Sequence, residues 1–199
     1  MVVLEIADYR NFTRVYDDMV LQFPESELKS FEKFISLMKN SDYKLILASD
    51  AGKYIGYIMV FFDSADNYLW LDYIAVFKEY HSCGYGGKML DALSNLFPQT
   101  DGVFLEVEKP DVTQENTLRR IKFYKKHGAV LVNNNYLYPN AEGFLPMDLY
   151  YIPYKTVIPA KKMIFNIIKN VFDVLHKDLQ HKDYVYNLIV NESRDSDAD

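Results

Sequence analysis

A glycine-rich segment near the middle of the chain has the clearest chemical meaning. Residues 81–88 read His-Ser-Cys-Gly-Tyr-Gly-Gly-Lys and lie between a mostly apolar strand-like run, 68–76, and a stretch of helical character. Such a turn leaves backbone N–H groups unpaired where the helix begins. These donors and the helix macrodipole together bind an anion such as a phosphate. Side chains in place of Gly84, Gly86 and Gly87 would hold the anion away from the backbone. The segment therefore predicts a phosphate-binding loop.

The spacing of these glycines excludes two common nucleotide-binding loops. Met89 follows Gly87 and Lys88, so the hydroxyl that a P-loop places on magnesium is missing. The Gly-x-Gly-x-x-Gly fingerprint does not occur, and the turn lies near mid-chain instead of after a first strand. The loop is therefore assigned neither to P-loop enzymes nor to dinucleotide-binding folds.

Two segments of the chain resemble sequence motifs of one enzyme family. The run 68–76, Tyr-Leu-Trp-Leu-Asp-Tyr-Ile-Ala-Val, and the loop after it resemble motif A of the GNAT N-acetyltransferase superfamily. In that motif the strand leads into Gln/Arg-x-x-Gly-x-Gly/Ala, and His81 stands here in the first position. The stretch 119–129, Arg-Arg-Ile-Lys-Phe-Tyr-Lys-Lys-His-Gly-Ala, resembles motif B, a helix ending in Phe-Tyr-x-x-x-Gly-Phe/Ala. Two motifs in the family's order are more specific than either alone.

The resemblance carries expectations about fold and activity. It implies an α/β fold, the GNAT acyl-CoA N-acyltransferase fold, with a mixed central sheet flanked by helices over residues 1–154. It also implies acetyl-CoA as cosubstrate and acetyl transfer to a primary amine of a small molecule or peptide, by direct attack in a ternary complex. The altered motif residues and the extra C-terminal segment leave an alternative open, a non-catalytic acyl-CoA-binding or regulatory module. No set of His, Cys, Asp and Glu has the ligand spacing of a zinc site, so no metal is expected.

Under this resemblance the cosubstrate contacts fall on motif A and on the start of motif B. We expect the backbone of the strand end and of the loop to hold the pantetheine and pyrophosphate groups. In motif B, Thr117 stands where an Asn is common, with Asn116 beside it. The residues assigned to the cosubstrate are Ile74, Val76, His81, Ser82, Cys83, Gly84, Tyr85, Gly86, Gly87, Lys88, Asn116 and Tyr124.

Three residues are candidates for acid–base chemistry. An alkyl amine of pKa ~10.4 is neutral at pH 7 about once in 2,500 molecules, equivalent to ~4.6 kcal/mol, whereas deprotonating a thiol of pKa ~8.5 takes only ~2 kcal/mol. Removing the amine proton is therefore the larger demand. Asp72 and Glu106 could do this if both face the gap between their strands, the alternative being that they are solvated carboxylates. Tyr124 matches the motif B tyrosine that protonates the thiolate in many relatives, the alternative being core packing.

The elements that must position these residues follow from hydrophobic periodicity. Strands are predicted at 2–6, 43–48, 54–62, 68–76, 103–108, 129–132 and 147–154, and helices at 9–23, 26–40, 84–97 and 113–127. Gly128 is expected to end the last of these helices. Alternation along the 68–76 strand places Trp70, Asp72 and Ile74 on one face. The segment 22–26 and a polar loop at 133–146 are expected to shape the acceptor site.

The C-terminal part of the chain is predicted to be a helical extension, 155–190, followed by a disordered acidic tail, 191–199. A second, shorter helix is expected around 184–189. One apolar stripe is expected on the first helix, at Ile164, Ile167, Ile168, Val171, Phe172 and Leu175. This stripe must be buried by packing on the core, in a homodimer, or as a cover over the acceptor site, and packing or dimerisation is favoured.

Length and composition indicate the size of the domain and exclude several kinds of partner and location. With 199 residues, 49% of them hydrophobic, the chain can bury a full core in one domain plus an appendage. The net charge of −6 argues against nucleic acid as a partner, because phosphate contacts need clustered Lys and Arg. The single cysteine excludes an internal disulfide and suits a reducing compartment. No apolar run approaches the ~20 residues of a membrane span and no signal peptide is found, so we expect a cytoplasmic protein without membrane contact.

Overall fold

A computed structural model describes residues 1–155 and 157–195, with side chains described as far as Glu192. The chain divides into two compact units, Met1–Gly102 and Val103–Asp199. The predicted domain limits stay a prediction. Strands and helices alternate along the chain, which confirms the predicted α/β class. Among the described residues, no helix is both long and apolar enough to cross a membrane.

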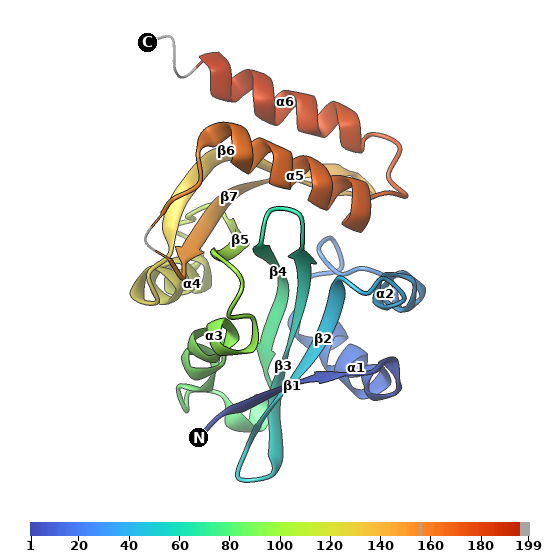
Figure 1. Cartoon of the computed structure of the whole chain (residues 1–199), viewed down its shortest axis with the longest axis vertical. Helices are drawn as coiled ribbons and strands as arrows, with labels where there is room; N and C mark the ends of the chain where they lie inside the picture. Colours follow the sequence, from blue (N-terminus) through green and yellow to red (C-terminus); the bar gives the residue numbers. More distant parts are fainter. Residues whose placement is uncertain (156, 196–199) are drawn as a thin grey trace. The chain divides into compact units, whose positions relative to one another are not determined.

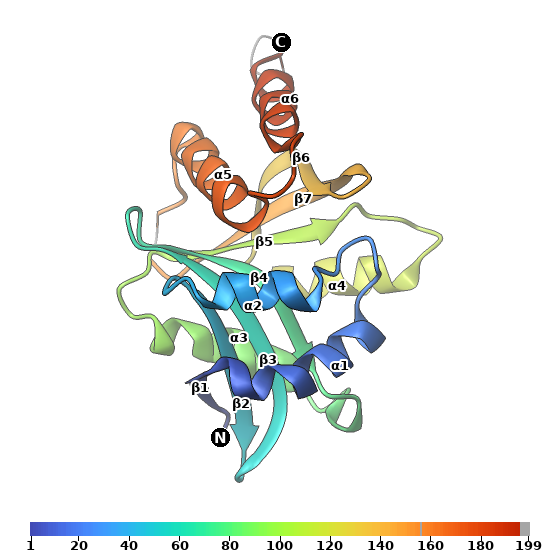
Figure 2. The ribbon, with the colours of Figure 1, turned by 90° about the vertical axis from the view of Figure 1, so that its right-hand side faces the viewer.

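The first unit contains a four-stranded antiparallel sheet in the order β1-β2-β3-β4. Its strands are β1 (Val3–Ala7), β2 (Tyr43–Asp50), β3 (Lys53–Asp63) and β4 (Tyr68–Val76). Its helices are α1 (Phe12–Gln22), α2 (Phe31–Met38) and α3 (Tyr85–Leu96), with single 3-10 turns η1 (Tyr9–Asn11) and η2 (Lys78–Tyr80). Helices α1 and α2 lie on one face of this sheet and α3 on the other (Figures 1 and 2). Coverage of both faces explains why β3 and β4 are apolar almost throughout.

Helix α2 begins at Phe31 and not near residue 26 as predicted. The Ser30 hydroxyl accepts a hydrogen bond from the Lys33 N–H at 3.2 Å, and the extended backbone at Ser30 makes it the N-cap. The chain before it forms a turn, closed by the Leu28 N–H and the Pro24 carbonyl at 3.0 Å. Two serines are four residues apart in this stretch, and the structure uses the second, Ser30, as the cap. The segment between α1 and α2 is therefore longer than the sequence predicted.

The second unit carries the remaining strands in the order β5-β7-β6. They are β5 (Gly102–Glu108, which starts at the last residue of the first unit), β6 (Val130–Asn140) and β7 (Gly143–Pro153). The helices are α4 (Glu115–Lys126), α5 (Lys161–Leu175) and α6 (Lys182–Asp195). Gly128 follows α4 with a positive φ of 85°, so its predicted role in ending that helix is confirmed.

The predicted polar loop at 133–146 is wrong, because these residues belong to a hairpin of β6 and β7. Asn140 pairs with Gly143 at its tip, where the Asn140 side chain accepts the Glu142 N–H at 3.1 Å. Register shifts surround Asn133, so two bulges interrupt the strand at the run of three asparagines. Asparagine runs are typical of loops, and the bulges conceal the two-residue alternation that identifies a strand.

The predicted apolar stripe of α5 is confirmed, since all six of its residues are buried. The Phe172 ring contacts Tyr136 of β6, with centroids 6.2 Å apart, and His181 in the α5–α6 link lies 2.8 Å from the Gly143 carbonyl oxygen. The α5–α6 pair therefore packs beside the hairpin of its own unit (Figure 2). Packing within the chain already buries this stripe, and the predicted homodimer stays a prediction. Of the predicted tail, 191–195 continue α6 and 196–199 lie outside the described residues.

Candidate functional site

Strand β4 has a bulge at Asp72. The antiparallel register pairs Tyr73 with Met59 and Leu71 with Val60, and it leaves Asp72 without a partner on β3. A bulge of one residue bends its strand and changes the side on which the following side chains lie. The bulge therefore determines on which side of the sheet the last side chains of β4 lie, just before the glycine-rich loop.

The bulge makes the predicted alternation of β4 wrong. Trp70 pairs with Phe61 of β3, whereas Ile74 pairs with Ile58. Phe61 and Ile58 are three residues apart on β3, so they lie on opposite faces of the sheet, and their partners must do the same. Trp70, Asp72 and Ile74 therefore do not share one face as predicted. An insertion of one residue between paired strands is not visible in a single strand's sequence.

Asp72 is a buried, ion-paired carboxylate. Its Oδ1 lies 2.7 Å from the Lys29 Nζ, and the exposed fractions of the two side chains are only 2% and 7%. Its Oδ2 accepts a hydrogen bond from the Tyr43 hydroxyl at 2.5 Å. Buried charges require such partners, because desolvating an unpaired ion is costly. Sequence reasoning missed Lys29, which lies 43 residues away along the chain.

At the carboxyl end of β4, the backbone N–H and C=O groups of two residues point away from β3. The Phe77 N–H donates to the Ile55 carbonyl at 2.9 Å, so these two residues form a hydrogen-bonded pair. The neighbouring pair, Val76 with Gly56, is therefore non-hydrogen-bonded, and the same holds for Ile74 two residues earlier. The N–H and C=O groups of Ile74 and Val76 thus point away from β3. This is the strand segment to which the sequence assigned the pantetheine arm.

Two side chains donate to the Val76 carbonyl oxygen. The Gln22 Nε2 lies 3.1 Å from it and the His81 Nε2 lies 2.8 Å from it. A carbonyl oxygen only accepts, so the His81 Nε2 carries the proton, and Nδ1 remains for another partner. His81 is exposed and was predicted from its position in the motif. Gln22 was missed, because nothing in the sequence links the end of α1 to the end of β4.

Gly56 allows the strands to approach closely beside this segment. A Cβ on Gly56 would lie 2.3 Å from the Ala75 carbonyl oxygen and 3.0 Å from the Val76 Cα. Only glycine fits at such a distance, so β3 supports the end of β4 directly. An isolated glycine inside an apolar strand was a signal that could have indicated this position.

The glycine-rich loop has the geometry of an anion site. Ser82 and Gly84 have positive φ values of 62° and 74°, and α3 starts at Tyr85 immediately after Gly84. Among the described residues, no backbone acceptor is found for the N–H groups of 83–87, whereas the Lys88 N–H reaches the Gly84 carbonyl at 3.4 Å. Left-handed residues followed by a helix N-terminus turn successive N–H groups toward one point. The assignment of this loop to the diphosphate stays a prediction.

The remaining side chains of the loop lie around these donors. Cys83 is exposed and its thiol contacts the His81 carbonyl at 3.4 Å. The Tyr85 hydroxyl donates to Asp50 at 3.0 Å, and the Lys88 Nζ lies 5.0 Å from the centre of the Tyr85 ring. Lys88 is exposed, so its ammonium adds a mobile positive charge to the rim of the loop.

The two acid–base candidates of the second unit have different surroundings. Glu106 is half-buried and accepts a hydrogen bond from the hydroxyl of the fully buried Tyr136. Burial raises the pKa of Tyr124 to about 12, a nearby Arg120 lowers it and Glu108 raises it further. Arg120 and Glu108 form an ion pair with each other. Tyr124 thus stays protonated at neutral pH and can donate a hydrogen bond, whereas Glu106 can accept a proton.

Asn116 and Thr117, at the start of α4, differ in burial and in hydrogen bonding. Asn116 is exposed. Thr117 is buried, and its hydroxyl lies 2.9 Å from the Gln114 carbonyl and 3.2 Å from the Asp111 carbonyl. Over residues 1–155 and 157–195, no group of three or more His, Cys, Asp and Glu could hold a metal ion.

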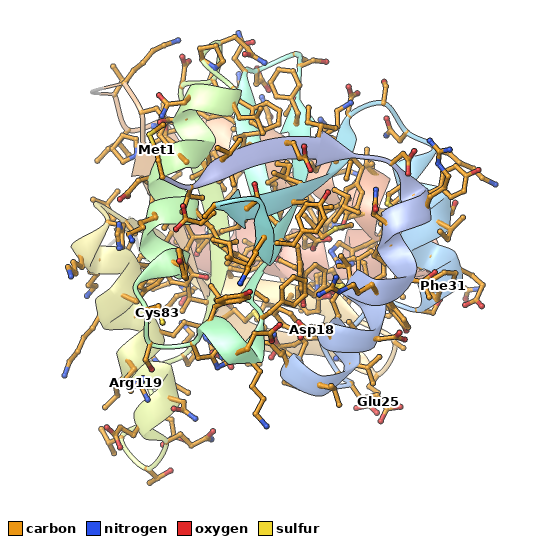
Figure 3. The ribbon with its side chains drawn as sticks, turned by 90° about the horizontal axis from the view of Figure 1, so that it is seen from below. Met1, Asp18, Glu25, Phe31, Cys83 and Arg119 are labelled. Carbon is orange, nitrogen blue, oxygen red and sulfur yellow. The ribbon has the colours of Figure 1, made fainter. Side chains whose placement is uncertain are left out.

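The structure brings most cosubstrate candidates of the first unit together. The end of β4, η2 and the start of α3 follow one another along the chain, and the contact of His81 with the Val76 carbonyl joins the strand end to the loop, in which Figure 3 labels Cys83. Asp72, also on β4, is turned instead toward Lys29 and Tyr43. The arrangement can hold a diphosphate by backbone N–H groups and an extended amide-bearing chain by the end of β4.

Comparisons with known proteins agree with this geometry. Residues 11–129 match the Acetyltransferase (GNAT) family. The chain is 31% identical over 112 residues to "Putative acetyltransferase YjbC" of Bacillus subtilis (strain 168), a match that covers 56% of this chain and 54% of that protein. The chain therefore spans about half the length of this curated relative.

Solved structures show the same fold. A "Putative acetyltransferase from GNAT family" of Bacteroides thetaiotaomicron has a TM-score of 0.75 at 22% identity, covering 87% of this chain and 97% of its own. Arabidopsis thaliana NAA60 in complex with acetyl-CoA has a TM-score of 0.58 at 15% identity, covering 77% of this chain and 99% of its own. These similarities confirm the predicted GNAT fold. Because the family match spans more than half of its residues, the chain belongs to the acetyltransferase (GNAT) family.

Proposed function

We propose that this chain transfers the acetyl group of acetyl-CoA to a primary amine of a small molecule or peptide. The observation that carries the proposal is the loop at 82–88, where two left-handed residues precede the N-terminus of α3 and the N–H groups of 83–87 have no backbone acceptor among the described residues. Membership of the GNAT family supports acetyl-CoA as the cosubstrate. The loop would hold the diphosphate, and the N–H and C=O groups of Ile74 together with the N–H of Val76 would hold the pantetheine arm, since the Val76 carbonyl already accepts from Gln22 and His81.

The acetyl group moves in one displacement within a ternary complex. The amine nitrogen attacks the thioester carbonyl carbon, a C–N bond forms, and the C–S bond breaks to release the thiolate of CoA. Glu106 takes the proton that the amine nitrogen loses. We favour Glu106 over Asp72 for this role, because Asp72 forms a buried ion pair with Lys29, whereas Glu106 is half-buried and accepts a hydrogen bond from the Tyr136 hydroxyl. Asp72 instead holds the segment between α1 and α2 against β4.

Tyr124 serves the leaving group as a hydrogen-bond donor. Its pKa of about 12 lies well above the ~8.5 of a thiol, so complete transfer of its proton to the thiolate would be uphill by ~5 kcal/mol. Donation of a hydrogen bond to the developing negative charge avoids that cost, because the proton stays on the phenol. The CoA thiolate then takes its proton from water.

The test separates binding from turnover. Titration calorimetry with acetyl-CoA measures binding, and release of CoA thiol against a library of amines measures transfer. We expect micromolar to millimolar binding and thiol release with at least one amine. Glu106→Gln should lower the rate by ~10²–10⁴-fold, as expected for loss of a general base, and leave binding of acetyl-CoA unchanged. The matched control is Glu142→Gln at the exposed tip of the β6–β7 hairpin.

Two results would contradict the proposal. Absence of acetyl-CoA binding by the intact chain would overturn the assignment of the loop. Binding without thiol release on any amine would favour the alternative that the chain is a non-catalytic acyl-CoA-binding module.

A further inference from the structure

Three polar side chains of α1 lie along one line of the helix. Arg14, Asp18 and Gln22 are spaced four residues apart, so they lie on the same helix face, and we call them the α1 polar stripe. Figure 3 shows Asp18 on this helix, on the side turned toward the strands. The stripe borders the buried apolar face of the helix, which consists of Phe12, Val15 and Met19. Each of its members has a partner near the end of β4.

The contacts of the stripe form a continuous chain. The Tyr57 hydroxyl donates to the Asp18 Oδ2 at 2.8 Å, and the Gln22 Nε2 lies 2.5 Å from the same oxygen. The Gln22 Nε2 also donates to the Val76 carbonyl at 3.1 Å. Gln22 thus uses its two amide hydrogens on two acceptors, so the orientation of the amide is determined by Asp18. Tyr57 is fully buried, which fixes Asp18 in turn.

The peptide group between Val76 and Phe77, here called the β4 exit peptide, is held on both sides. Its carbonyl accepts from Gln22 and from His81, at 3.1 and 2.8 Å, and its N–H donates to the Ile55 carbonyl at 2.9 Å. A peptide group is planar, so bonds at its two ends fix its rotation about the chain.

The side chain that follows the β4 exit peptide is also held by α1. The Arg14 guanidinium lies 5.3 Å from the centre of the Phe77 ring, and the Tyr57 ring lies 5.7 Å from it. Phe77 is buried and caps η2, the turn that leads into the glycine-rich loop. The direction in which the loop leaves β4 therefore depends on α1.

From these contacts we propose that Gln22, oriented by Asp18, is a positioning residue for the cosubstrate. It fixes the β4 exit peptide and so sets the distance between the strand end that takes the pantetheine arm and the loop that takes the diphosphate. This inference rests on the proposed function, because it assigns the loop to coenzyme A. It extends that function to α1, which contributes to binding without touching the phosphates. Coenzyme A and α1 are then coupled, so that each stabilises the bound arrangement of the other.

The first experiment measures binding of coenzyme A by titration calorimetry. Gln22→Met keeps the length of the side chain and removes both amide donors, so we expect the dissociation constant to rise about 2- to 13-fold, the factor for one net hydrogen bond. The matched control is Gln180→Met, the same change at an exposed residue between α5 and α6, which should leave the constant unchanged. Circular dichroism and urea unfolding of both variants verify that they are folded.

The second experiment tests whether Asp18 contributes to coenzyme A binding by orienting the Gln22 amide. Asp18→Asn retains a carbonyl oxygen that accepts from Gln22, so binding should stay within about 2-fold, whereas Asp18→Ala should weaken binding as much as Gln22→Met. Hydrogen exchange gives an independent readout. Coenzyme A should slow amide exchange in α1 of the unchanged chain, and this protection should be lost in Gln22→Met.

The outcomes separate the two proposals. Binding of coenzyme A that is equally tight with and without the Gln22→Met change overturns the role of Gln22 and leaves the proposed function intact. Equal loss in Asp18→Asn and Asp18→Ala overturns the orienting role of Asp18. Absence of binding by the unchanged chain overturns the proposed function and this inference with it.

Discussion

The ion pair between Lys29 and Asp72 makes the strongest prediction about stability. The two charges lie 2.7 Å apart, with only 7% and 2% of their side chains exposed. Lys29→Met leaves the buried Asp72 carboxylate with the hydrogen bond from the Tyr43 hydroxyl, and Asp72→Asn removes the carboxylate that pairs with the buried Lys29 ammonium. Removing one member of a buried pair lowers the free energy of unfolding by ~3–5 kcal/mol. Each single variant should lose an amount in this range.

The double variant should lose no more than the worse single variant. Once both charges are gone, no uncompensated ion remains, and the introduced amide oxygen still accepts from the Tyr43 hydroxyl. If the two losses were independent, they would add to ~6–10 kcal/mol, so the expected coupling energy is ~3 kcal/mol or more. Urea unfolding followed by tryptophan fluorescence measures these values. Trp70 is the single tryptophan of the chain, is 1% exposed, and lies two residues from Asp72.

The same substitutions at an exposed pair provide the control. Lys169 and Asp173 are one helical turn apart on α5, at 2.9 Å, with 38% and 45% of their side chains exposed. Lys169→Met and Asp173→Asn should each lower the free energy of unfolding by less than ~1 kcal/mol, with coupling of ~0.5 kcal/mol. If the Lys29 and Asp72 losses add within ~0.5 kcal/mol, the pair is not energetically coupled and the buried ion pair is refuted.

Three further predictions concern other parts of the chain. Gly56→Ala places a Cβ 2.3 Å from the Ala75 carbonyl oxygen, so we expect a loss of ~1–3 kcal/mol in urea unfolding together with weaker binding of coenzyme A; normal stability would show that β3 and β4 separate easily. Burial raises the pKa of Tyr124 to about 12. The contribution of this protonated phenol to the free energy of unfolding is therefore fully present below pH ~10, the ordinary pKa of tyrosine, and it is lost as pH rises toward 12. Between pH 8 and pH 11 the unchanged chain should therefore lose ~1.4 kcal/mol that Tyr124→Phe retains, and parallel pH profiles would contradict the burial of the phenol. Phe172→Ala on α5 removes a fully buried ring that contacts Tyr136, with an expected loss of ~3–5 kcal/mol in thermal or urea unfolding; a loss below ~1 kcal/mol would contradict packing of α5 on the hairpin.

Features that depend on neighbouring residues were predictable from the sequence. The loop at 81–88 was recognisable because glycines, a preceding apolar strand and a following helix are all local properties. The apolar stripe of α5 was predicted residue for residue, because a period of 3.6 residues is visible along one helix. The end of α4 at Gly128 was also predicted, since few residues other than glycine adopt a positive φ without cost.

Features that depend on a second strand were not predictable. The bulge at Asp72 appears only when β4 is paired with β3, and it moves Ile74 to the face opposite Trp70. The hairpin at 133–146 was missed because bulges around Asn133 interrupt its alternation. Both errors have one origin, since a strand's register is a property of two segments and a single sequence segment contains only half of it.

The sequence by itself determined which chemical groups are present and which kind of secondary structure carries each of them. These are a glycine-rich loop at the start of one helix, a tyrosine near the end of a second helix, and carboxylates on two strands. The tertiary structure alone decided what those groups contact. It placed Lys29 beside Asp72, 43 residues away in the sequence, and it placed the Gln22 amide within hydrogen-bond distance of the Val76 carbonyl, 54 residues away. Dihedral preferences and periodicity act over a few residues, whereas the partner of a buried polar group is whichever side chain the packing brings within hydrogen-bond distance.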